Sequence, residues 1–344
     1  MYKAPFSYFG GKSKIADEVW KRLGPDSPNY IEPFAGSAAM LLSRPGWTPN
    51  SNYTETINDA DGFVSNFWRA LQCAPDDVAH YADWPVNEND LHARHAWLVG
   101  QRDSLQSRLE GDPNYFDAKI AGWWCWGACC WIGSGWCAGK GPWQQIDGEL
   151  VNVSSNAVGV KRQRVHLGHK GVGVNRQRVH LGDKGVGEAG TGDAGLYEWM
   201  HALAERLRRV RVASGDWQRV CGSNTTTIAQ WSSVAVFLDP PYSFEAGRDN
   251  NLYAMESGTV AHDVREWAIA HGDDSRFRIA LCGYDIEHEH LMPEGWQAMP
   301  WEAHGGYANP GNVGKDNALR EVVWFSPHCR SVIEANKQMS FLEA

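Results

Sequence analysis

The 344-residue sequence contains no stretch of about 18 uninterrupted apolar residues, the length that a membrane-spanning helix requires. Its first residues, Met1 to Pro5, lack the apolar segment of a secretory signal. These absences argue against a membrane protein and a small secreted protein. Because 43% of the residues are apolar and 21% are charged, the chain can bury a core and is not disordered as a whole.

Sequence motifs for metal and nucleotide sites are also missing. The eight cysteines do not form two Cys-x-x-Cys pairs, so we expect no metal; buried reduced thiols fit a cytoplasmic protein. A dinucleotide-binding Gly-x-Gly-x-x-Gly motif is absent, since residues 38 and 39 are alanine. Gly11-Lys12-Ser13 is not part of a phosphate-binding P-loop, because Phe6 stands where that loop requires glycine.

The basic residues are unevenly distributed. The net charge of −9 alone argues against a nucleic-acid partner, yet residues 158–187 hold seven Lys and Arg against one acid, Asp183. This segment contains a direct repeat with a period of 14 residues, VGVKRQRVHLGHKG at 158–171 and VGVNRQRVHLGDKG at 172–185. Two copies are too few for a solenoid, so each copy is expected to form a loop or hairpin.

Arginines in such a loop can make bidentate contacts to phosphate or guanine. The alternative is a solvated loop with no ligand. The residues expected to bind DNA are Lys140, Lys161, Arg162, Arg164, Arg176 and Arg178.

Short apolar runs rich in β-forming residues alternate with helix-period segments, a pattern typical of a parallel α/β sheet. The expected strands are 30–34, 54–58, 209–213, 234–238, 277–282 and 321–325. The clearest helix has an apolar stripe at Leu196, Met200, Leu203, Leu207 and Val210, with Asp193 as its expected cap. Ligands of such sheets bind beyond the carboxyl ends of the strands.

The alternation breaks between residues 73 and 195, where we expect an insertion. It includes an expected polar helix at 90–109, six tryptophans between 122 and 143, and the basic repeats. We expect Trp123, Trp124 and Trp126 to lie in the core and leave Trp131 and Trp136 open. The expected domains are therefore an α/β domain formed by 1–72 and 196–330, an inserted domain at 73–195 and a C-terminal tail at 331–344.

The apolar run 234–238 ends at Asp239-Pro240-Pro241-Tyr242, and two consecutive prolines make this turn rigid. The exocyclic amino group of a base is a poor nucleophile, because its lone pair is delocalised into the ring. The Asp239 carboxylate and the Pro240 carbonyl can each accept one N–H, which favours a pyramidal nitrogen with a free lone pair. Tyr242 would offer a flat face to an extruded base. The alternative is a plain turn at the end of a strand.

The sequence 239–242 matches the DPPY motif of amino-group DNA methyltransferases, and other segments resemble the Dam-like D12 class of adenine-N6 methyltransferases of bacteria and phages. Residues 5–12 resemble the opening W-x-G-G-K segment of that class, with Tyr8 in place of the usual Trp. Residues 30–39 resemble its E-P-F-x-G-x-G/A loop, 57–59 the acidic end of its second strand, and 215–217 its later D-F/W site. The resemblance covers about residues 1–72 and 196–325, in the order of the class.

This resemblance implies a Rossmann-like S-adenosylmethionine-dependent methyltransferase sheet with an inserted, mainly helical target-recognition domain. Asp59 would accept hydrogen bonds from the ribose, Asp216 from the adenine of the donor, and Trp217 would pack on that ring. Lys12 would contact either the carboxylate of the donor or the active-site loop. The expected cofactor-binding residues are Tyr8, Gly11, Lys12, Glu32, Pro33, Phe34, Gly36, Ser37, Ala38, Asp59, Asp216, Trp217 and Asp239; the expected catalytic residues are Asp239, Pro240, Pro241 and Tyr242.

We therefore predict a DNA adenine-N6 methyltransferase that transfers a methyl group from S-adenosylmethionine to a flipped-out adenine in double-stranded DNA. A restriction endonuclease partner in the same system is a further expectation. The alternatives are a cytosine-N4 methyltransferase, whose class more often has Ser in place of Asp239, a non-catalytic DNA-binding protein that keeps the fold, and an RNA or nucleotide modifier. The basic repeats depart from the pattern of the class, so no recognition residue can be carried over to them.

Overall fold

The computed structural model describes residues 2–6, 8, 11–131, 136–137, 143–146, 149–152, 194–222, 232–242, 260–288, 290, 292–301 and 320–331. Lys140, both 14-residue repeats with their arginines, Asp193 and the tail beyond residue 331 lie outside these ranges. The predictions for them therefore stay predictions.

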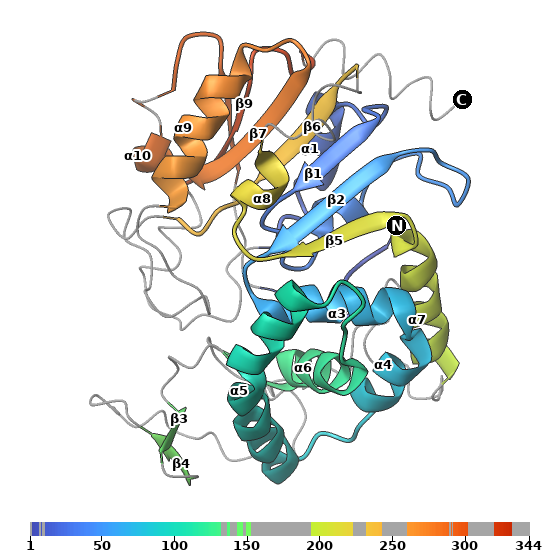
Figure 1. The fold of residues 1–344 in the computed structure, drawn as a ribbon. Coiled ribbons are helices and arrows are strands. Elements are labelled where there is room, and N and C mark those ends of the chain that lie inside the picture. Colours follow the sequence, from blue (N-terminus) through green and yellow to red (C-terminus); the bar gives the residue numbers. More distant parts are fainter. Residues whose placement is uncertain are drawn as a thin grey trace, which may run out of the picture.

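The described residues form a mixed α/β fold around a seven-stranded sheet with the order β5-β2-β1-β6-β7-β9-β8 (Figure 1). Its strands are β1 (Asn29–Glu32), β2 (Thr54–Asp59), β5 (Val210–Ser214), β6 (Val234–Leu238), β7 (Phe277–Tyr284), β8 (Gln297–Pro300) and β9 (Glu321–Phe325). Strands β5, β2, β1, β6 and β7 are parallel, whereas β9 runs antiparallel to β7 and β8 antiparallel to β9. The expected α/β sheet is thus confirmed, and each of the six apolar runs contributes a strand.

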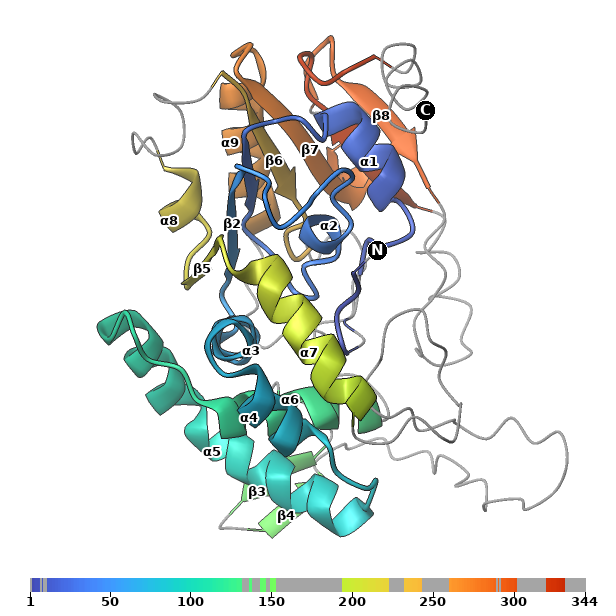
Figure 2. The ribbon, with the colours of Figure 1, turned by 90° about the vertical axis from the view of Figure 1, so that its right-hand side faces the viewer.

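Strand β6 shows why these runs form strands. All five of its residues are buried, and they alternate between the two faces of the sheet, because successive side chains of a strand point to opposite sides. Val234, Val236 and Leu238 belong to the cluster that packs against α9 (Val260–Gly272), while Ala235 and Phe237 belong to the cluster on the other face. Helices α1 (Ala16–Leu23) and α2 (Ala39–Leu42) cover that second face (Figure 2).

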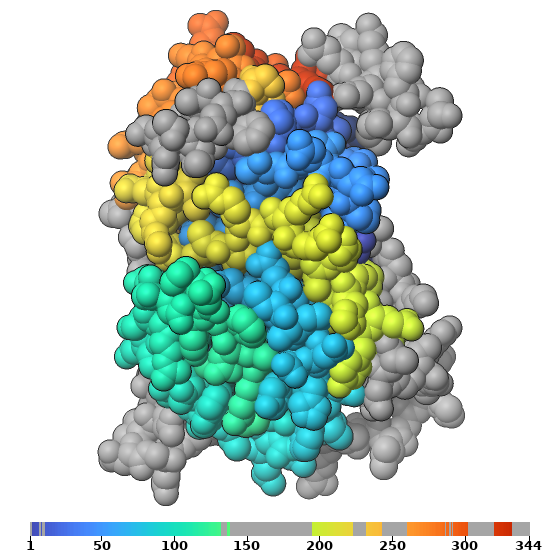
Figure 3. Space-filling model, turned by 45° about the vertical axis from the view of Figure 1, so that its right-hand side comes forward, coloured from blue at the N-terminus to red at the C-terminus, as the bar shows by residue number. Residues whose placement is uncertain are grey.

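Below the sheet, beside its edge strand β5, lies a group of helices (Figure 1). They are α3 (Gly62–Cys73), α4 (Pro75–Ala82), α5 (Glu88–Gly111), α6 (Ala118–Cys130) and α7 (Ala194–Leu207). Helix α3 packs against α5, α6 and α7, and α4 packs against α6 and α7. In the space-filling view these helices adjoin the sheet without a visible groove between them (Figure 3).

The buried core is continuous across the start of the expected insertion. Phe67 of α3, Trp124 of α6 and Leu203 of α7 belong to the same buried cluster as Tyr30 of β1 and Phe237 of β6. The described part of 73–195 is mainly helical, and it adds only the two-stranded hairpin of β3 (Trp143–Ile146) and β4 (Glu149–Asn152). Two short helices, α8 (Gln218–Cys221) and α10 (Asp285–His288), complete the described elements.

The tryptophan-rich segment forms α6. Trp124 and Trp126 are buried, as predicted, while Trp123 is half-buried and packs against the core. Trp131, which the sequence left open, stacks on His95 with 4.8 Å between ring centroids. Val210 was predicted to continue the stripe of α7 but begins β5 instead, because the chain turns at residues 208 and 209.

All eight cysteines lie within the described ranges, and none of them forms a disulfide. No helix among the described residues combines the length and apolarity needed to cross a membrane.

Candidate active site

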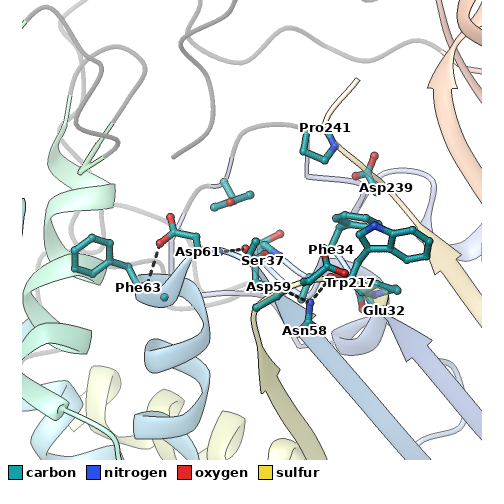
Figure 4. A pocket seen from close by; sticks show the side chains of 18 of the residues that line it. Glu32, Phe34, Ser37, Asn58, Asp59, Asp61, Phe63, Trp217, Asp239 and Pro241 are labelled. Atoms are coloured by element: carbon teal, nitrogen blue, oxygen red, sulfur yellow. Dashed lines mark hydrogen bonds between the residues drawn. The ribbon is translucent and has the colours of Figure 1, made fainter. Parts of the chain in front are cut away.

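The order in which the strands are added to the sheet reverses at β1. This strand pairs with β2 on one side and with β6 on the other, and open α/β sheets bind their ligands at the carboxyl ends of strands at such a point. The loops after β1, β2, β5 and β6 border a cavity of about 620 Å³. Figure 4 shows Asp239 and Pro241 on one side of it and Asp61 and Phe63 on the other.

Most of the predicted site residues border this one cavity. Those that do are Tyr8, Gly11, Lys12, Glu32, Pro33, Phe34, Gly36, Ser37, Asp59, Asp216, Trp217, Asp239 and Pro241. Ala38, Pro240 and Tyr242 are not among its lining residues. Segments from five places in the sequence thus meet at one edge of the sheet.

The loop after β1 makes a close turn that depends on Gly36. This residue has φ of 47°, its N–H donates to Oδ2 of Asp59 at 2.8 Å, and its carbonyl accepts from Nε1 of Trp68 at 3.0 Å. A Cβ atom here would lie 2.6 Å from the ring of Tyr8. Only glycine combines this backbone conformation with so close a neighbour.

Ala38 also has a left-handed conformation, with φ of 50°, which is uncommon for a residue with a side chain. It is fully buried and donates its N–H to the carbonyl of Ala35 at 2.6 Å, just before α2 begins. Ala38 therefore shapes the turn and does not face the cavity.

Asp59 connects the loops after β1 and β2. Its Oδ2 accepts the N–H of Gly36 and its Oδ1 accepts the N–H of Asp61 at 2.9 Å. Burial, together with the negative charge of Asp61, raises the pKa of Asp59 to about 7. Next to it, Asn58 donates from Nδ2 to the carbonyls of Pro33 and Gly215, both at 3.0 Å, and so ties the β1 loop to the β5 loop.

Two aromatic rings border the same part of the cavity. Trp217 follows β5 and lies 6.3 Å from Phe34 between ring centroids, at an angle of 32°. The preceding residue, Asp216, accepts the N–H of Gln218 at 2.8 Å and so begins α8. The rings of Phe34 and Trp217 thus offer apolar faces to the cavity, and the carboxylate of Asp216 borders the same cavity.

Glu32 is a buried carboxyl group at the end of β1. Its Oε2 accepts the hydroxyl of Tyr30 at 2.9 Å and the N–H of Leu41 at 3.0 Å. Burial raises the pKa of Glu32 to about 8, although both hydrogen bonds oppose the shift.

Asp239, directly after β6, is bound by a lysine from the N-terminal segment. Lys12 Nζ lies 2.9 Å from Oδ1 of Asp239 and is itself buried. Lys12 thus contacts the loop that follows β6, and its contact with a donor carboxylate stays a prediction. Burial raises the pKa of Asp239, and the ammonium of Lys12 opposes that shift.

Tyr242 differs from its predicted arrangement. Its hydroxyl donates to Oε2 of Glu321 at 2.9 Å, and its ring lies edge-on to Tyr284 at 4.7 Å between centroids. The side chain is 8% exposed and does not border the cavity. The ring therefore presents no open face for a base in this structure, because Tyr284 and Glu321 hold it in the core.

Sequence reasoning missed one wall of the cavity. This wall consists of Asp61 and Phe63 at the start of α3 and of Arg102, Asp103, Leu105, Gln106, Ser107 and Glu110 on α5. The α5 residues among them lie on one face of that helix. The sequence predicts a polar helix here but does not distinguish this face from a solvent-exposed one. The sequence carries no signal that this polar face lies against the sheet.

The cavity is mainly acidic. Its charged lining consists of Lys12 and Arg102 against Glu32, Asp59, Asp61, Asp103, Glu110, Asp216 and Asp239. Such a lining favours a ligand that carries positive charge. Within the described ranges, no group of three His, Cys, Asp or Glu side chains is arranged to hold a metal ion.

Comparison with known proteins is consistent with this geometry. Residues 8–100, which include Lys12, the β1 loop, Asp59 and the first part of α5, match the family model of the D12 class N6 adenine-specific DNA methyltransferases. A search of curated proteins found no match. Over residues 8–100, the family match confirms the resemblance that the motifs show to the D12 class N6 adenine-specific DNA methyltransferases.

Proposed function

We propose that the cavity binds S-adenosylmethionine and that Asp239 and Pro240 bind the amino group of an adenine that has left the DNA duplex. One observation carries the proposal: Asp239 borders the same cavity as the Gly36 loop, Asp59 and Trp217. The methyl group and the amino group must meet in line, and a shared cavity makes this possible.

The residues present fit this donor. A volume of about 620 Å³ lies in the usual range for cofactor sites. The excess of carboxylates suits a sulfonium and an ammonium group, and the rings of Phe34 and Trp217 suit an adenine. Oδ1 of Asn58, a buried acceptor beside the cavity, has no hydrogen-bond partner among the described residues.

The donor supplies an electrophilic methyl group, whose bond to sulfur breaks with both electrons remaining on sulfur. The chain itself supplies acceptors and position. Lys12 and Tyr242 both approach Oδ1 of Asp239, which leaves Oδ2 to accept one N–H of the adenine, while the carbonyl of Pro240 accepts the other. Two such acceptors favour a pyramidal nitrogen whose lone pair points at the methyl carbon.

After transfer the nitrogen carries a positive charge and must lose one proton. Asp239 already accepts an N–H of this nitrogen, and burial raises its pKa, so the carboxylate is suited to take the proton. No metal ion is needed in this scheme, because the sulfonium is already an activated donor.

Residues 73–195 are proposed as the inserted target-recognition domain, between the catalytic segments 1–72 and 196–330. In this proposal the basic repeats contact the phosphates of double-stranded DNA through Lys161, Arg162, Arg164, Arg176 and Arg178, and Lys140 makes a further contact.

Replacing Asp239 by Ala tests the central assignment. We expect methyl transfer to fall by at least about 100-fold, while the donor affinity measured by calorimetric titration changes by less than about threefold. The half-buried carboxylate of Asp274, which pairs with Arg276 and does not border the cavity, provides the control Asp274→Asn. Retained methyl transfer in Asp239→Ala would refute the role given to this residue.

A further inference from the structure

Glu321 contacts Lys12, a lining residue of the cavity, although it belongs to none of the sequence motifs. It is the first residue of β9, which runs antiparallel to β7, and it pairs with Tyr284 at the carboxyl end of β7. An antiparallel strand begins where its parallel neighbours end, so β9 brings its first side chain to the catalytic edge of the sheet. Glu321 is 8% exposed.

Glu321 and Asp239 share the same two hydrogen-bond donors. Lys12 Nζ lies 2.9 Å from Oδ1 of Asp239 and 3.5 Å from Oε2 of Glu321. The hydroxyl of Tyr242 lies 3.3 Å from the same Oδ1 and 2.9 Å from the same Oε2. These four atoms form a closed ring in which donors and acceptors alternate.

The hydroxyl of Tyr242 has only one proton, and the shorter contact directs it to Glu321. The ammonium of Lys12 is likewise divided between two carboxylates. Without Glu321, the hydroxyl of Tyr242 and the ammonium of Lys12 would both turn to Asp239. They would then neutralise the negative charge of Asp239 more completely. A carboxylate that is neutralised in this way is a weaker acceptor for the N–H of an amino group.

We propose that Glu321 is a positioning residue for methyl transfer, which draws the Tyr242 proton and part of the Lys12 charge away from Asp239 and so keeps that carboxylate a strong acceptor. The inference rests on the proposed function of Asp239. It assigns a role in catalysis to a residue outside the loops that bind the donor.

The protonation of Asp239 responds to groups on several elements. Those that face it are Lys12 before α1, Glu32 at the end of β1, Tyr242 in its own loop, Cys282 on β7 and Glu321 on β9. Burial raises the pKa of both Asp239 and Glu321, and Lys12 opposes the shift in each. Removing the charge of Glu321 should therefore lower the pKa of Asp239, whereas removing that of Lys12 should raise it.

The experiment measures single-turnover methyl transfer to duplex DNA against pH for wild type, Glu321→Gln, Glu321→Ala and Lys12→Met. The Gln variant keeps an acceptor for Tyr242 without the charge, and it guards against a folding defect in the Ala variant. Asp285→Asn is the matched control, because Asp285 pairs with Arg320 at the same strand end but is not part of the ring. The affinity for S-adenosylmethionine and the midpoint of thermal unfolding are measured for each variant.

We expect the rate to fall about tenfold in Glu321→Ala and less in Glu321→Gln, with donor affinity within about threefold of wild type. The acid limb of the rate should move to lower pH by roughly half to one unit in both Glu321 variants. In Lys12→Met it should move to higher pH, and in the control it should stay in place.

An acid limb that is unchanged or moves to higher pH in Glu321→Gln, while the wild type is active, would overturn the inference. A fall in thermal stability and rate with the acid limb in place would also overturn it, since that result indicates a structural role alone. A wild-type enzyme that forms no N6-methyladenine would instead contradict the proposed function, so the two failures are distinguishable.

Discussion

The N–H of Gly36 donates a hydrogen bond to Oδ2 of Asp59 at 2.8 Å, and this bond joins the loops at the ends of β1 and β2. The loop proposed to approach the donor is thus held by the carboxylate proposed to bind the ribose. A change in either residue should affect both parts of the site.

Donor binding should depend on pH through Asp59. The pKa of this carboxyl is raised to about 7, so it is mainly protonated at pH 6 and mainly ionised at pH 8. A cationic donor favours the ionised form, and affinity should therefore rise with pH over this range. In Asp59→Asn this contribution is lost.

Calorimetric titrations of wild type and Asp59→Asn at pH 6, 7 and 8 test this prediction. The dissociation constant of Asp59→Asn is divided by that of the wild type, so that the titration of the methyl donor and that of Glu32 cancel. This ratio should grow about fivefold or more from pH 6 to pH 8. A constant ratio would show that Asp59 does not titrate in this way.

Replacing Gly36 by Ala should weaken donor binding about tenfold or more. The new Cβ would meet the ring of Tyr8 at 2.6 Å, and the φ of 47° adds a strain of about 1 kcal/mol. Gly46→Ala is the control, because Gly46 has φ of 70° but no neighbour within 4 Å of an added Cβ.

The double variant Tyr8→Ala/Gly36→Ala separates the two causes. If the clash with Tyr8 dominates, the double variant binds the donor more tightly than Gly36→Ala alone. If it binds no better, the contact with Tyr8 is not the reason for the loss.

A buried ion cluster should dominate the stability of the junction between sheet and helices. Glu55 on β2 contacts Arg44 at 3.1 Å and Arg206 of α7 at 2.6 Å, and all three side chains are buried. Glu55→Ala leaves two buried guanidinium groups without their carboxylate, and the free energy of unfolding should fall by about 3–5 kcal/mol.

Urea denaturation measures this loss. The control is Glu205→Ala, also on α7, where an exposed carboxylate lies 3.6 Å from Arg208 and should contribute less than about 1 kcal/mol. Equal effects of the two substitutions would contradict the importance assigned to the buried cluster.

DNA binding should depend on the arginines of the 14-residue repeats. Replacing Arg162, Arg164, Arg176 and Arg178 by Ala should weaken binding to duplex DNA and reduce the salt dependence of log K by about 0.9 per lost phosphate contact. Substitution of Arg208 and Arg211 by Ala, two exposed arginines outside the repeats, serves as the control. An unchanged salt dependence would exclude phosphate contacts by the repeats.

The sequence allowed the sheet and most of the cavity lining to be predicted for a physical reason. Parallel strands that are buried on both faces read as short apolar runs, and their carboxyl ends converge on one edge of the sheet. Strand β8 was missed because it is an edge strand with mostly exposed residues and hence no apolar run.

Contacts between distant side chains could not be predicted in the same way. The polar face of α5 that borders the cavity resembles any solvated helix face in the sequence. Glu321 was missed because only the antiparallel direction of β9 brings it to Lys12 and Tyr242. The buried position of Tyr242 likewise follows from its neighbours Tyr284 and Glu321, which no local pattern reveals.

The most direct test of the account is mass spectrometry of nucleosides from duplex DNA incubated with the protein and S-adenosylmethionine, in parallel with Asp239→Ala. We predict N6-methyldeoxyadenosine with the wild type and none above background with the variant. N4-methyldeoxycytidine as the product, no methylated nucleoside at all, or equal N6-methyldeoxyadenosine from both proteins would contradict the account.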